Sequence, residues 1–376
     1  MIKNEKSLIL LMSLLLIGCT AKQAPVKEQS RYNSQTLDAG FDTVISLIAY
    51  ADDETQFNEY FDLVRSEFKR YNALFDKYND YEGVNNIKTI NDNAGIQPVK
   101  VDADILEMLE LSKQFSELSN NKFDITMGPV LEIWHEYREA GISLNTEGQD
   151  APVPSMEELQ QAKACVGWNN VEINEADSTV YLNQACASLD VGSVAKGFTA
   201  EKVAQELEAR GLTSGILNAG GNVRVIGSKP DGSAWNAGIQ VPDLNGINGT
   251  LGVLPLSGKQ SLVTSGDYQR YYLSNGELMH HIIDPDTLFP ARHSRALSVV
   301  TDNSGVADIC STLLYTMDYQ EANEMIQKIR DLGYSLSVVW VYNSDDEIPE
   351  GKKEFKYLDY IIVTSDDIED IFTVSK

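Results

Sequence analysis

The spacing of the apolar residues changes part-way along this chain of 376 residues, and that change constrains its fold more than any other feature. In the first half the apolar side chains recur every three or four positions, for example at Phe57, Phe61 and Val64, which predicts amphipathic helices. From Ile216 onward the apolar runs are short, which predicts strands. Because helices precede strands instead of alternating with them, we predict an α+β fold rather than a doubly wound parallel sheet. It should be a single elaborated domain with a helix-rich first half and a strand-rich second half.

A few individual elements follow from local patterns. A first strand is predicted over residues 41–50 and a helix over residues 307–315. The dipeptide Asn275-Gly276 suits a tight primed turn, so residues 271–283 should form a hairpin. No glycine-rich loop of Rossmann or Walker type occurs, so any bound nucleotide must be held in another way.

The N-terminus has the build of a bacterial export signal. Two lysines precede an apolar run, residues 8–17, which is too short to span a bilayer. The run ends at Gly18-Cys19, a small residue before a cysteine, as in bacterial lipoprotein signals. We predict that residues 1–18 are a signal peptide and that Cys19 is lipidated on its thiol and new amine, with palmitate among the lipids. The alternative is an ordinary signal peptide with an incidental cysteine.

The residues after Cys19 set the predicted domain boundary. Residues 19–35 are polar and poor in aromatic residues, which predicts a lipidated flexible tether. Residues 36–376 would then form the folded domain. No later segment has the ~20 consecutive apolar residues of a membrane helix. The expected location is the cell membrane, lipid-anchored on the extracytoplasmic face.

Three further cysteines, Cys165, Cys186 and Cys310, lack the close spacing of a zinc ribbon or a redox dithiol. We expect small buried thiols, although an exported location would permit disulfides.

The formal net charge of -26 argues against nucleic acid as a partner, because phosphates would be repelled at long range. An acidic protein that binds a pyrophosphate must overcome its own field locally. A divalent cation would do so.

Four short segments place polar and glycine residues among apolar ones. In the first, residues 121–129, Lys122 and Asp124 flank Phe123 at a turn and could seat a ring and a polar head group. Equally, Asp124 could simply cap a helix. In the second, residues 188–198, a strand runs through two glycines into a helix that begins near Lys196. Such a helix start attracts anions, unless the lysine is merely solvated.

The third segment holds the adjacent histidines His280 and His281. Neighbouring residues in a strand point to opposite faces, so they should not form a metal pair. We expect one to face the site and the other to face solvent, although a lone histidine can also be purely structural.

In the fourth segment, Asp308 and Thr312 are four residues apart and share one face of the predicted helix. Their oxygens are hard donors that suit magnesium rather than zinc. The alternative is that Asp308 caps the helix and Thr312 bonds back to its own turn.

These segments and several others resemble, in order, the motifs of the ApbE family of FAD:protein FMN transferases. The resemblance runs from about Asp38 to about Met317 through the following motifs: Gly40-Phe41-Asp42-Thr43, Phe75-Asp76-Lys77-Tyr78, residues 123–129 followed by Trp134, Leu189-Asp190 to Ala195-Lys196-Gly197, Asn218-Ala219-Gly220-Gly221, Thr264 to Tyr268, His281 to Pro285, and Ala307-Asp308. Two departures stand out. Phe41-Asp42-Thr43 replaces the usual Met-Gly-Thr, and Leu288 replaces a usual glycine.

The resemblance implies a set of site residues. Those contacting or lining the dinucleotide site would be Phe41, Tyr78, Lys122, Phe123, Asp124, Asp190, Lys196 and Ile282. Phe41 and Tyr78 would touch the flavin or the adenine. Asp308 and Thr312 would hold Mg²⁺ together with the backbone carbonyl of Ser193. His281 is similar to the family's proposed catalytic histidine, with Asp284 nearby.

The resemblance also implies a reaction. A threonine or serine hydroxyl of an exported or membrane redox protein would attack the FMN-side phosphorus of FAD, with His281 or Asp284 as the base, and AMP would leave. The acceptor should carry an Asp-containing flavinylation motif that ends in Thr or Ser. Two alternatives stay open: a Mg²⁺-dependent FAD pyrophosphatase and a non-catalytic flavin-binding lipoprotein.

Overall fold

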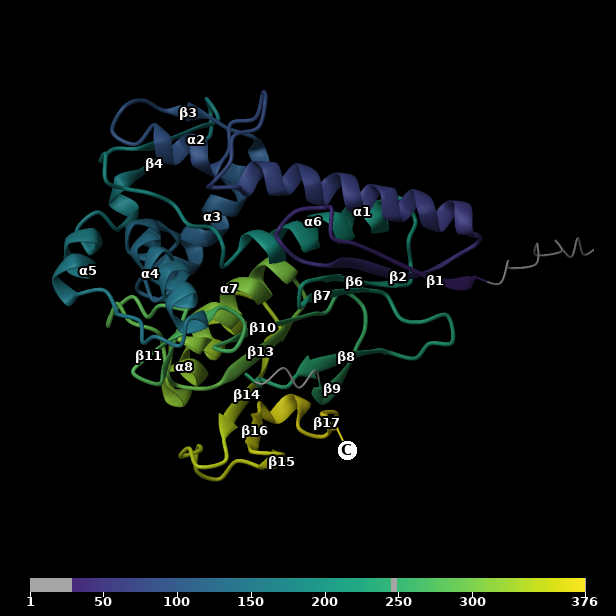
Figure 1. Ribbon diagram of the computed structural model, residues 1–376. Helices are drawn as coiled ribbons and strands as arrows, with labels where there is room; N and C mark the ends of the chain where they lie inside the picture. Colours follow the sequence, from purple (N-terminus) through teal and green to yellow (C-terminus); the bar gives the residue numbers. More distant parts are fainter. Residues whose placement is uncertain (1–28, 245–248, 376) are drawn as a thin grey trace, which may run out of the picture.

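A nine-stranded antiparallel sheet forms the centre of the molecule in the computed structural model, which describes residues 29–244 and 249–375 (Figure 1). Its strand order is β1-β2-β6-β7-β10-β13-β14-β16-β15. The bounds are β1 Ser30–Thr36, β2 Ile45–Ala51, β6 Gly215–Ala219, β7 Asn222–Ile226, β10 Ser261–Gly266, β13 Ala296–Thr301, β14 Ser337–Asn343, β15 Phe355–Tyr357 and β16 Tyr360–Thr364. Every pairing is antiparallel, so the predicted α+β class is confirmed and a doubly wound sheet is excluded.

Helices supply most of the first half of the chain, as predicted. The α-helices are α1 Glu54–Phe75, α2 Ile87–Asp92, α3 Ala103–Leu118, α4 Gly128–Thr146, α5 Met156–Lys163, α6 Ala195–Ala209, α7 Ser304–Tyr315 and α8 Tyr319–Asp331. Short 3₁₀ turns are η1 Ile125–Met127, η2 Trp168–Asn170 and η3 Asp366–Ile368. No helix in the described ranges combines the length and the apolarity that a bilayer crossing demands.

Three small sheets complete the fold. They contain β3 Val99–Lys100, β5 Thr179–Leu182 and β4 Val171–Asn174; β11 Tyr271–Ser274 and β12 Glu277–His280; and β17 Thr373–Val374, β9 Thr250–Leu256 and β8 Trp235–Gln240. The β11–β12 pair turns at Asn275-Gly276, both with positive φ, as the primed-turn signal predicted.

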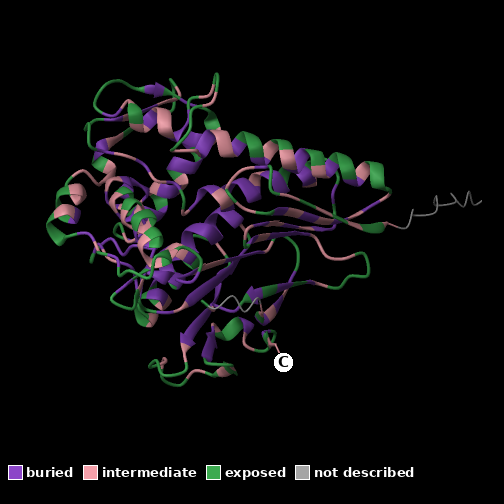
Figure 2. Ribbon diagram, in the orientation of Figure 1, coloured by how far each residue is buried: buried purple, intermediate pink, exposed green. Residues whose placement is uncertain are grey.

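The two faces of the large sheet are covered differently. Helices α1, α6 and α7 lie on one side, and β8 and β9 lie on the other (Figure 1). Helix α7 is apolar nearly all round and almost wholly buried between α6 and strands β10 and β13 (Figure 2). Its few polar residues are therefore conspicuous, because a polar group in such a place requires a partner or a ligand.

The signal peptide over residues 1–18 and the lipidation of Cys19 lie outside the described residues. The tether over residues 19–35 is wrong in its last part, because Ser30–Thr36 pairs with β2 along its whole length. This strand is polar and lies at the edge of the sheet, so no apolar alternation marks it in the sequence.

The cysteine prediction is wrong for two of the three residues. Cys165 and Cys186 form a disulfide, with Cα atoms 5.6 Å apart. The β4–β5 hairpin lies between them and brings the two ends of the segment together. Cys310, on α7, is a buried free thiol as expected.

Candidate active site

A cavity of about 660 Å³ collects segments that are far apart in the sequence. Its wall includes the loop before β2, the C-terminal end of α1, the turn before α4, the start of α6, the ends of β10 and β12, and one face of α7. The predicted residues that line it are Phe41, Tyr78, Lys122, Phe123, Asp124, Asp190, Ser193, Lys196, His281, Ile282, Asp308 and Thr312. Of the predicted catalytic and ligand-binding residues, only Asp284 is not part of the wall.

Asp308 and Thr312 project from α7 into this cavity one turn apart. The Asp308 carboxylate accepts a hydrogen bond from the backbone N–H of Gly197, at 2.8 Å. A Cβ on Gly197 would lie 2.3 Å from the Ser304 carbonyl oxygen, so the close approach of α6 to α7 requires glycine. Burial raises the pKa of Asp308, an effect that the nearby Lys196 ammonium partly offsets.

The purely structural alternative for this pair is wrong for Asp308. Asn303 caps α7, accepting from the N–H of Val306 at 3.0 Å, while Asp308 lies in the second turn. Ser311, not Thr312, bonds back to its own turn, through the Asp308 carbonyl. In the described part of the chain the Thr312 hydroxyl has no hydrogen-bond partner, so its oxygen is available to a ligand.

The Asp308 and Thr312 oxygens are the kind of ligand that a hard cation such as Mg²⁺ prefers, but two side chains cannot complete its coordination. No group of three or more His, Cys, Asp or Glu side chains positioned to hold a metal occurs among residues 29–244 and 249–375. A cation at Asp308 and Thr312 would therefore draw its remaining ligands from backbone oxygens, water or substrate. Mg²⁺ is usually bound in this way, through one or two carboxylates and substrate phosphates.

The start of α6 is a partly occupied anion site. One of its free amides, that of Gly197, already holds the Asp308 carboxylate. Lys196 lies in the first turn and donates to the side-chain oxygen of Asn222 at 3.2 Å. Among the described residues no carboxylate forms an ion pair with Lys196. Its positive charge therefore remains available to an anion in the cavity.

The two adjacent histidines differ sharply. His280 is almost fully buried; its Nε2 lies 2.7 Å from the Ala291 carbonyl oxygen and its Nδ1 accepts from the N–H of Ile282. These partners assign it the neutral Nε2–H tautomer and a structural role. Nδ1 of His281 is buried in the cavity wall without a partner in the described residues.

The prediction that one of these histidines faces solvent is wrong, since both line the cavity. Strand β12 ends at His280, so the alternation of faces does not continue to His281. Burial lowers the pKa of His281 to about 3, helped by the charges of Arg270 and Arg138. The ring is therefore neutral near pH 7.

Asp284 lies behind the wall and positions a lysine. Its carboxylate accepts from the Lys122 ammonium at 3.2 Å and from the N–H of Asp286 at 2.9 Å. Lys122 also pairs with Asp286 at 2.8 Å. Burial alone would lower the pKa of Lys122, but its hydrogen bonds to Asp286 and Asp284 raise it.

Asp190 has a partner that the sequence analysis did not assign to the site. Lys77 lies 2.8 Å from its carboxylate and 3.1 Å from that of Glu132. Although burial raises the pKa of Asp190, the Lys77 charge brings it below its usual value. The same ammonium lies 4.9 Å from the centre of the Tyr78 ring. The one sequence feature that could have identified Lys77 as a site residue is its position in the Phe75-Asp76-Lys77-Tyr78 motif.

Asp124 caps a helix, as one of its two predicted roles required, and it also lies in the cavity wall. At the start of η1 it accepts from the N–H of Thr126 at 2.8 Å and from its hydroxyl at 2.7 Å. Burial raises its pKa, an effect that the Thr126 hydrogen bonds partly offset.

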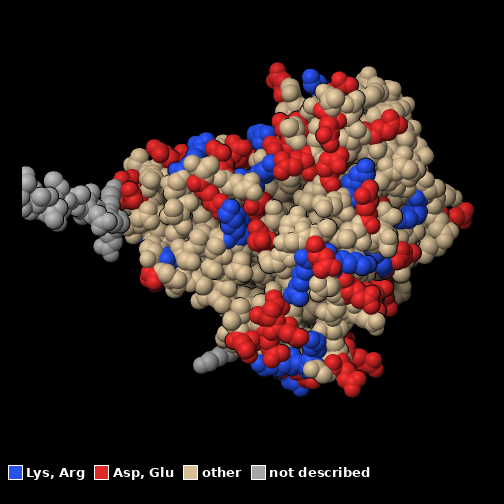
Figure 3. All heavy atoms as spheres, turned by 180° about the vertical axis from the view of Figure 1, so that it is seen from behind, with Lys and Arg blue, Asp and Glu red and all other residues tan. Residues whose placement is uncertain are grey.

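The balance of charged side chains in the cavity wall differs from that of the whole chain. Acidic side chains spread over the back of the molecule, with basic ones between them (Figure 3). Five cationic side chains line the cavity: Lys77, Lys122, Arg138, Lys196 and Arg270. Five carboxylates also line it: Asp42, Asp76, Asp124, Asp190 and Asp308. The wall is therefore balanced in formal charge, whereas the chain as a whole has a net charge of -26.

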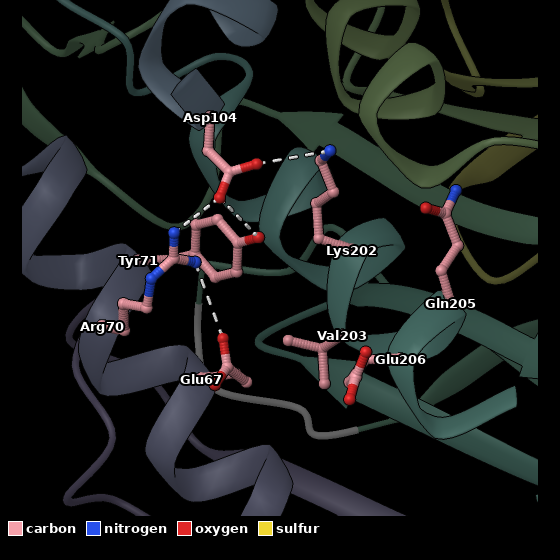
Figure 4. A pocket seen from close by; sticks show the side chains of 8 residues that line it. All are labelled: Glu67, Arg70, Tyr71, Asp104, Lys202, Val203, Gln205 and Glu206. Atoms are coloured by element: carbon pink, nitrogen blue, oxygen red, sulfur yellow. Dashed lines mark hydrogen bonds and ion pairs between the residues drawn. The ribbon is translucent and has the colours of Figure 1, made fainter. Parts of the chain in front are cut away.

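A second hollow, of about 480 Å³, lies between α1, α3 and α6 (Figure 4). Asp104 is at its centre, 2.7 Å from Arg70, 3.1 Å from the Tyr71 hydroxyl and 3.3 Å from Lys202. These charges pair with one another, so we regard this hollow as an ion-pair junction between three helices and not as a ligand site.

Comparison with known proteins places this geometry in a family. The sequence profile of the ApbE family matches residues 41–335. The chain belongs to the ApbE family. An FAD:protein FMN transferase of Klebsiella pneumoniae is 28% identical to this ApbE-family chain over 289 residues, covering 77% of the chain and 84% of that protein. One of Treponema pallidum is 31% identical over 256 residues, covering 64% and 67% respectively.

Solved structures agree with the family assignment. The crystal structure of an ApbE protein from Thermotoga maritima superimposes with a TM-score of 0.70 at 26% identity, covering 83% of this chain and 94% of that one. The flavin transferase ApbE of Vibrio cholerae has a TM-score of 0.68 at 20% identity, covering 92% and 99%, and supports the fold alone.

Proposed function

We propose that this ApbE-family chain transfers the FMN moiety of FAD to a threonine or serine hydroxyl of an exported or membrane redox protein and releases AMP. The observation that carries the proposal is one cavity in which the Asp308–Thr312 oxygen pair, the free charge of Lys196 and the unpartnered Nδ1 of His281 all face the same space. Relatives whose name is FAD:protein FMN transferase support the same reaction.

The phosphate end of FAD would lie at the start of α6. Lys196 would bind a pyrophosphate oxygen, and Asp308, Thr312 and the carbonyl of Ser193 would hold Mg²⁺. A bound Mg²⁺ there would neutralise charge that develops on the departing AMP. The Gly197 amide fixes the Asp308 carboxylate on the side of α6, so the carboxylate is oriented before substrate binds.

His281 is the better candidate for the base. Its Nδ1 is buried in the cavity wall without a partner in the described residues, whereas Asp284 already accepts from Lys122 and Asp286 and lies outside the wall. The acceptor hydroxyl oxygen would form a bond to the FMN-side phosphorus as the phosphorus–oxygen bond to AMP breaks. The hydroxyl proton would move to His281.

The dinucleotide's rings would lie at the two ends of the cavity. Phe41 and Tyr78 offer aromatic side chains to the cavity, and Lys122, Phe123, Asp124 and Ile282 line it as well. The Lys77–Asp190 pair would keep Tyr78 next to the cation that lies over its ring.

The proposed location rests on the sequence pattern of residues 1–19. We propose that Cys19 is lipidated and holds the enzyme at the extracytoplasmic face of the cell membrane, where its acceptors would also lie. The Cys165–Cys186 disulfide supports export, because such bonds persist in oxidising compartments.

An Asp308→Asn variant tests the proposal. The change keeps the size of the side chain but removes its charge, and loss of one charge-stabilising ligand typically reduces a rate by a few hundred-fold. Because burial raises the pKa of Asp308, the neutral amide should fold at least as stably as the carboxylate. Asp302→Asn, an exposed carboxylate just before α7, is the matched control.

The assay would mix protein, FAD and Mg²⁺ with a peptide that carries an Asp-containing, Thr-ended motif, and would follow peptide flavin fluorescence and AMP. Transfer that persists in Asp308→Asn would refute the metal assignment. FMN free in solution would identify a pyrophosphatase instead, and unchanged FAD would identify a flavin-binding protein without turnover.

A further inference from the structure

The loop that carries Phe41 is held in an unfavourable backbone conformation. Gly40, Phe41 and Asp42 have φ angles of 91°, 59° and 48°, so three successive residues are left-handed. Only glycine adopts this conformation readily, and a bulky side chain such as that of Phe41 disfavours it. Such a conformation persists only where surrounding contacts impose it.

Asn72, near the end of α1, makes the contact that holds this loop. Its side-chain oxygen accepts from the N–H of Phe41 at 2.7 Å. A Cβ on Gly40 would lie 2.4 Å from the Asn72 side chain, so the loop lies directly against this amide. The other end of the loop, at Thr43, lies against the backbone of Gly220. A Cβ on Gly220 would lie 2.0 Å from the Thr43 hydroxyl oxygen.

The same amide connects the loop to the segment that carries Tyr78. The Asn72 amide nitrogen donates to the Tyr81 hydroxyl at 3.1 Å, which in turn donates to Asp76 at 2.8 Å. The Asp76 carboxylate accepts from the N–H of Tyr78 at 2.6 Å and from that of Asn79 at 3.1 Å. One chain of hydrogen bonds therefore runs from the backbone of Phe41 to the backbone of Tyr78.

The residues that form this hydrogen-bond network all line the cavity. The Phe41 ring is half-buried and meets Phe68 edge-on at 6.0 Å, whereas the Tyr78 side chain is 55% exposed. The Phe41 ring packs on the edge of the core, and the Tyr78 ring lies beside Lys77 and His135. These contacts orient the rings, while the hydrogen bonds hold the backbone at both residues.

We infer that Asn72 is a positioning residue that fixes Phe41 and Tyr78 as the two sides of a site for a planar heteroaromatic ring, an inference that rests on the proposed function. Asn72 does not touch the reacting atoms. It holds the Phe41 N–H directly and the Tyr78 N–H through Tyr81 and Asp76. The ring is either the flavin or the adenine of the dinucleotide.

The test compares Asn72→Leu with Asn72→Asp in the full chain. Leucine has a similar size but no acceptor for the Phe41 N–H, whereas aspartate keeps that acceptor. Loss of one such hydrogen bond should raise the KM for FAD about tenfold with kcat within about twofold of the wild type. Asn72→Asp keeps the hydrogen bond from the Phe41 N–H and loses only the donor to Tyr81, so its KM should rise less than that of the leucine variant, to about the level of Tyr81→Phe. Asn58→Leu, on the exposed side of α1, is the control.

Direct binding separates this inference from the proposed function. Quenching of flavin fluorescence would give the affinity for FAD and FMN, and displacement of FAD would give that for ADP. The leucine variant should bind FAD more weakly. It should also bind FMN more weakly if the flavin lies between Phe41 and Tyr78, or ADP more weakly if the adenine lies there. Wild-type protein that fails to bind FAD would refute the proposed function itself.

Other outcomes would overturn the positioning role alone. These are an Asn72→Leu protein that keeps the wild-type KM, or equal impairment of the leucine and aspartate variants. If Asn72→Leu does not fold, Tyr81→Phe provides the second test, because it removes only the hydroxyl that links Asn72 to Asp76. It should raise the KM for FAD several-fold, and an unchanged KM would count against the inference.

Discussion

The indole N–H of Trp134 donates to the backbone carbonyl of Leu288 at 2.9 Å. Leu288 has a φ of 63° and is 5% exposed. A buried leucine is therefore held in the left-handed region, which favours glycine. The Trp134 hydrogen bond and the packing of the leucine side chain next to Phe289 keep the turn after Asp284 in place.

The backbone of this turn predicts an unusual order of stability between two variants. Leu288→Ala and Leu288→Gly both remove the buried side chain, and each should lower the free energy of unfolding by several kcal/mol. At a positive φ, alanine retains the left-handed penalty that glycine avoids, so the glycine variant should be more stable than the alanine variant by about 1 kcal/mol. Urea unfolding of both proteins measures the difference. An alanine variant as stable as the glycine variant would show that the turn relaxes.

The sequence predicts the class of the fold and the composition of the site better than it predicts their details. Spacing patterns are local, so α1, α7 and the β11–β12 hairpin could be recognised. Strand β1 could not, because a polar edge strand needs only backbone pairing with β2. The Cys165–Cys186 bond likewise depends on a hairpin between its ends, which the cysteine spacing does not reveal.

In the candidate site, too, local spacing could be predicted from the sequence, whereas contacts between distant residues could not. The helical spacing of Asp308 and Thr312 correctly predicted that both face one space. The different environments of His280 and His281 could not be predicted, because they depend on where β12 ends and on the distant Ala291 carbonyl. Lys77 was missed for a related reason: its partner Asp190 is more than a hundred positions away in the sequence.

His280 should make the protein sensitive to mild acid. Burial lowers its pKa to about 4, partly opposed by the hydrogen bond to Ala291, whereas its unfolded value is near 6.5. The unfolded chain therefore binds a proton first as pH falls, so stability is fully present above about pH 6.5 and is lost toward pH 4 at about 1.4 kcal/mol per unit.

A His280→Gln variant isolates this contribution. Glutamine can still donate to the Ala291 carbonyl but does not titrate. Between pH 7 and pH 5 the wild type should lose about 2 kcal/mol more unfolding free energy than the variant does. His281, which both proteins retain, cancels in the comparison. If urea unfolding gave the wild type and His280→Gln the same change in unfolding free energy with pH, His280 would not be buried in its neutral form.

The disulfide and the buried thiol predict distinct chemical behaviour. Cys165 and Cys186 close a loop with a sequence separation of 21, so replacing both with serine should lower the free energy of unfolding by about 3 kcal/mol. Reductant should destabilise the wild type by a similar amount and leave the double variant unchanged. Equal sensitivity of both proteins to reductant would exclude the bond.

Cys310 should remain unreactive in the folded protein, because burial raises the pKa of its thiol well above the usual value. In a Cys19→Ser background, a thiol reagent should label no site in the native state and one site after unfolding without reductant. Labelling of the native protein, or three labelled sites after unfolding, would contradict the assignment.

Asn91 on α2 should control the local order of the segment that carries Asp190. Its side-chain oxygen accepts from the N–H of Leu189 at 2.8 Å, and its nitrogen donates to the Leu189 carbonyl at 3.0 Å. One side chain thus satisfies both backbone groups of a buried residue. Asn91→Ala leaves both without this partner, so it should lower the unfolding free energy by about 2 kcal/mol.

Hydrogen exchange separates this local effect from a global one. In Asn91→Ala the Leu189 amide should exchange much faster than amides in α7, because its acceptor is gone. Asn91→Asp keeps the acceptor but loses the donor, so the Leu189 amide should stay protected even if global stability falls. Exchange that rises equally at Leu189 and in α7 would mean that Asn91 stabilises the whole domain rather than the Asp190 segment.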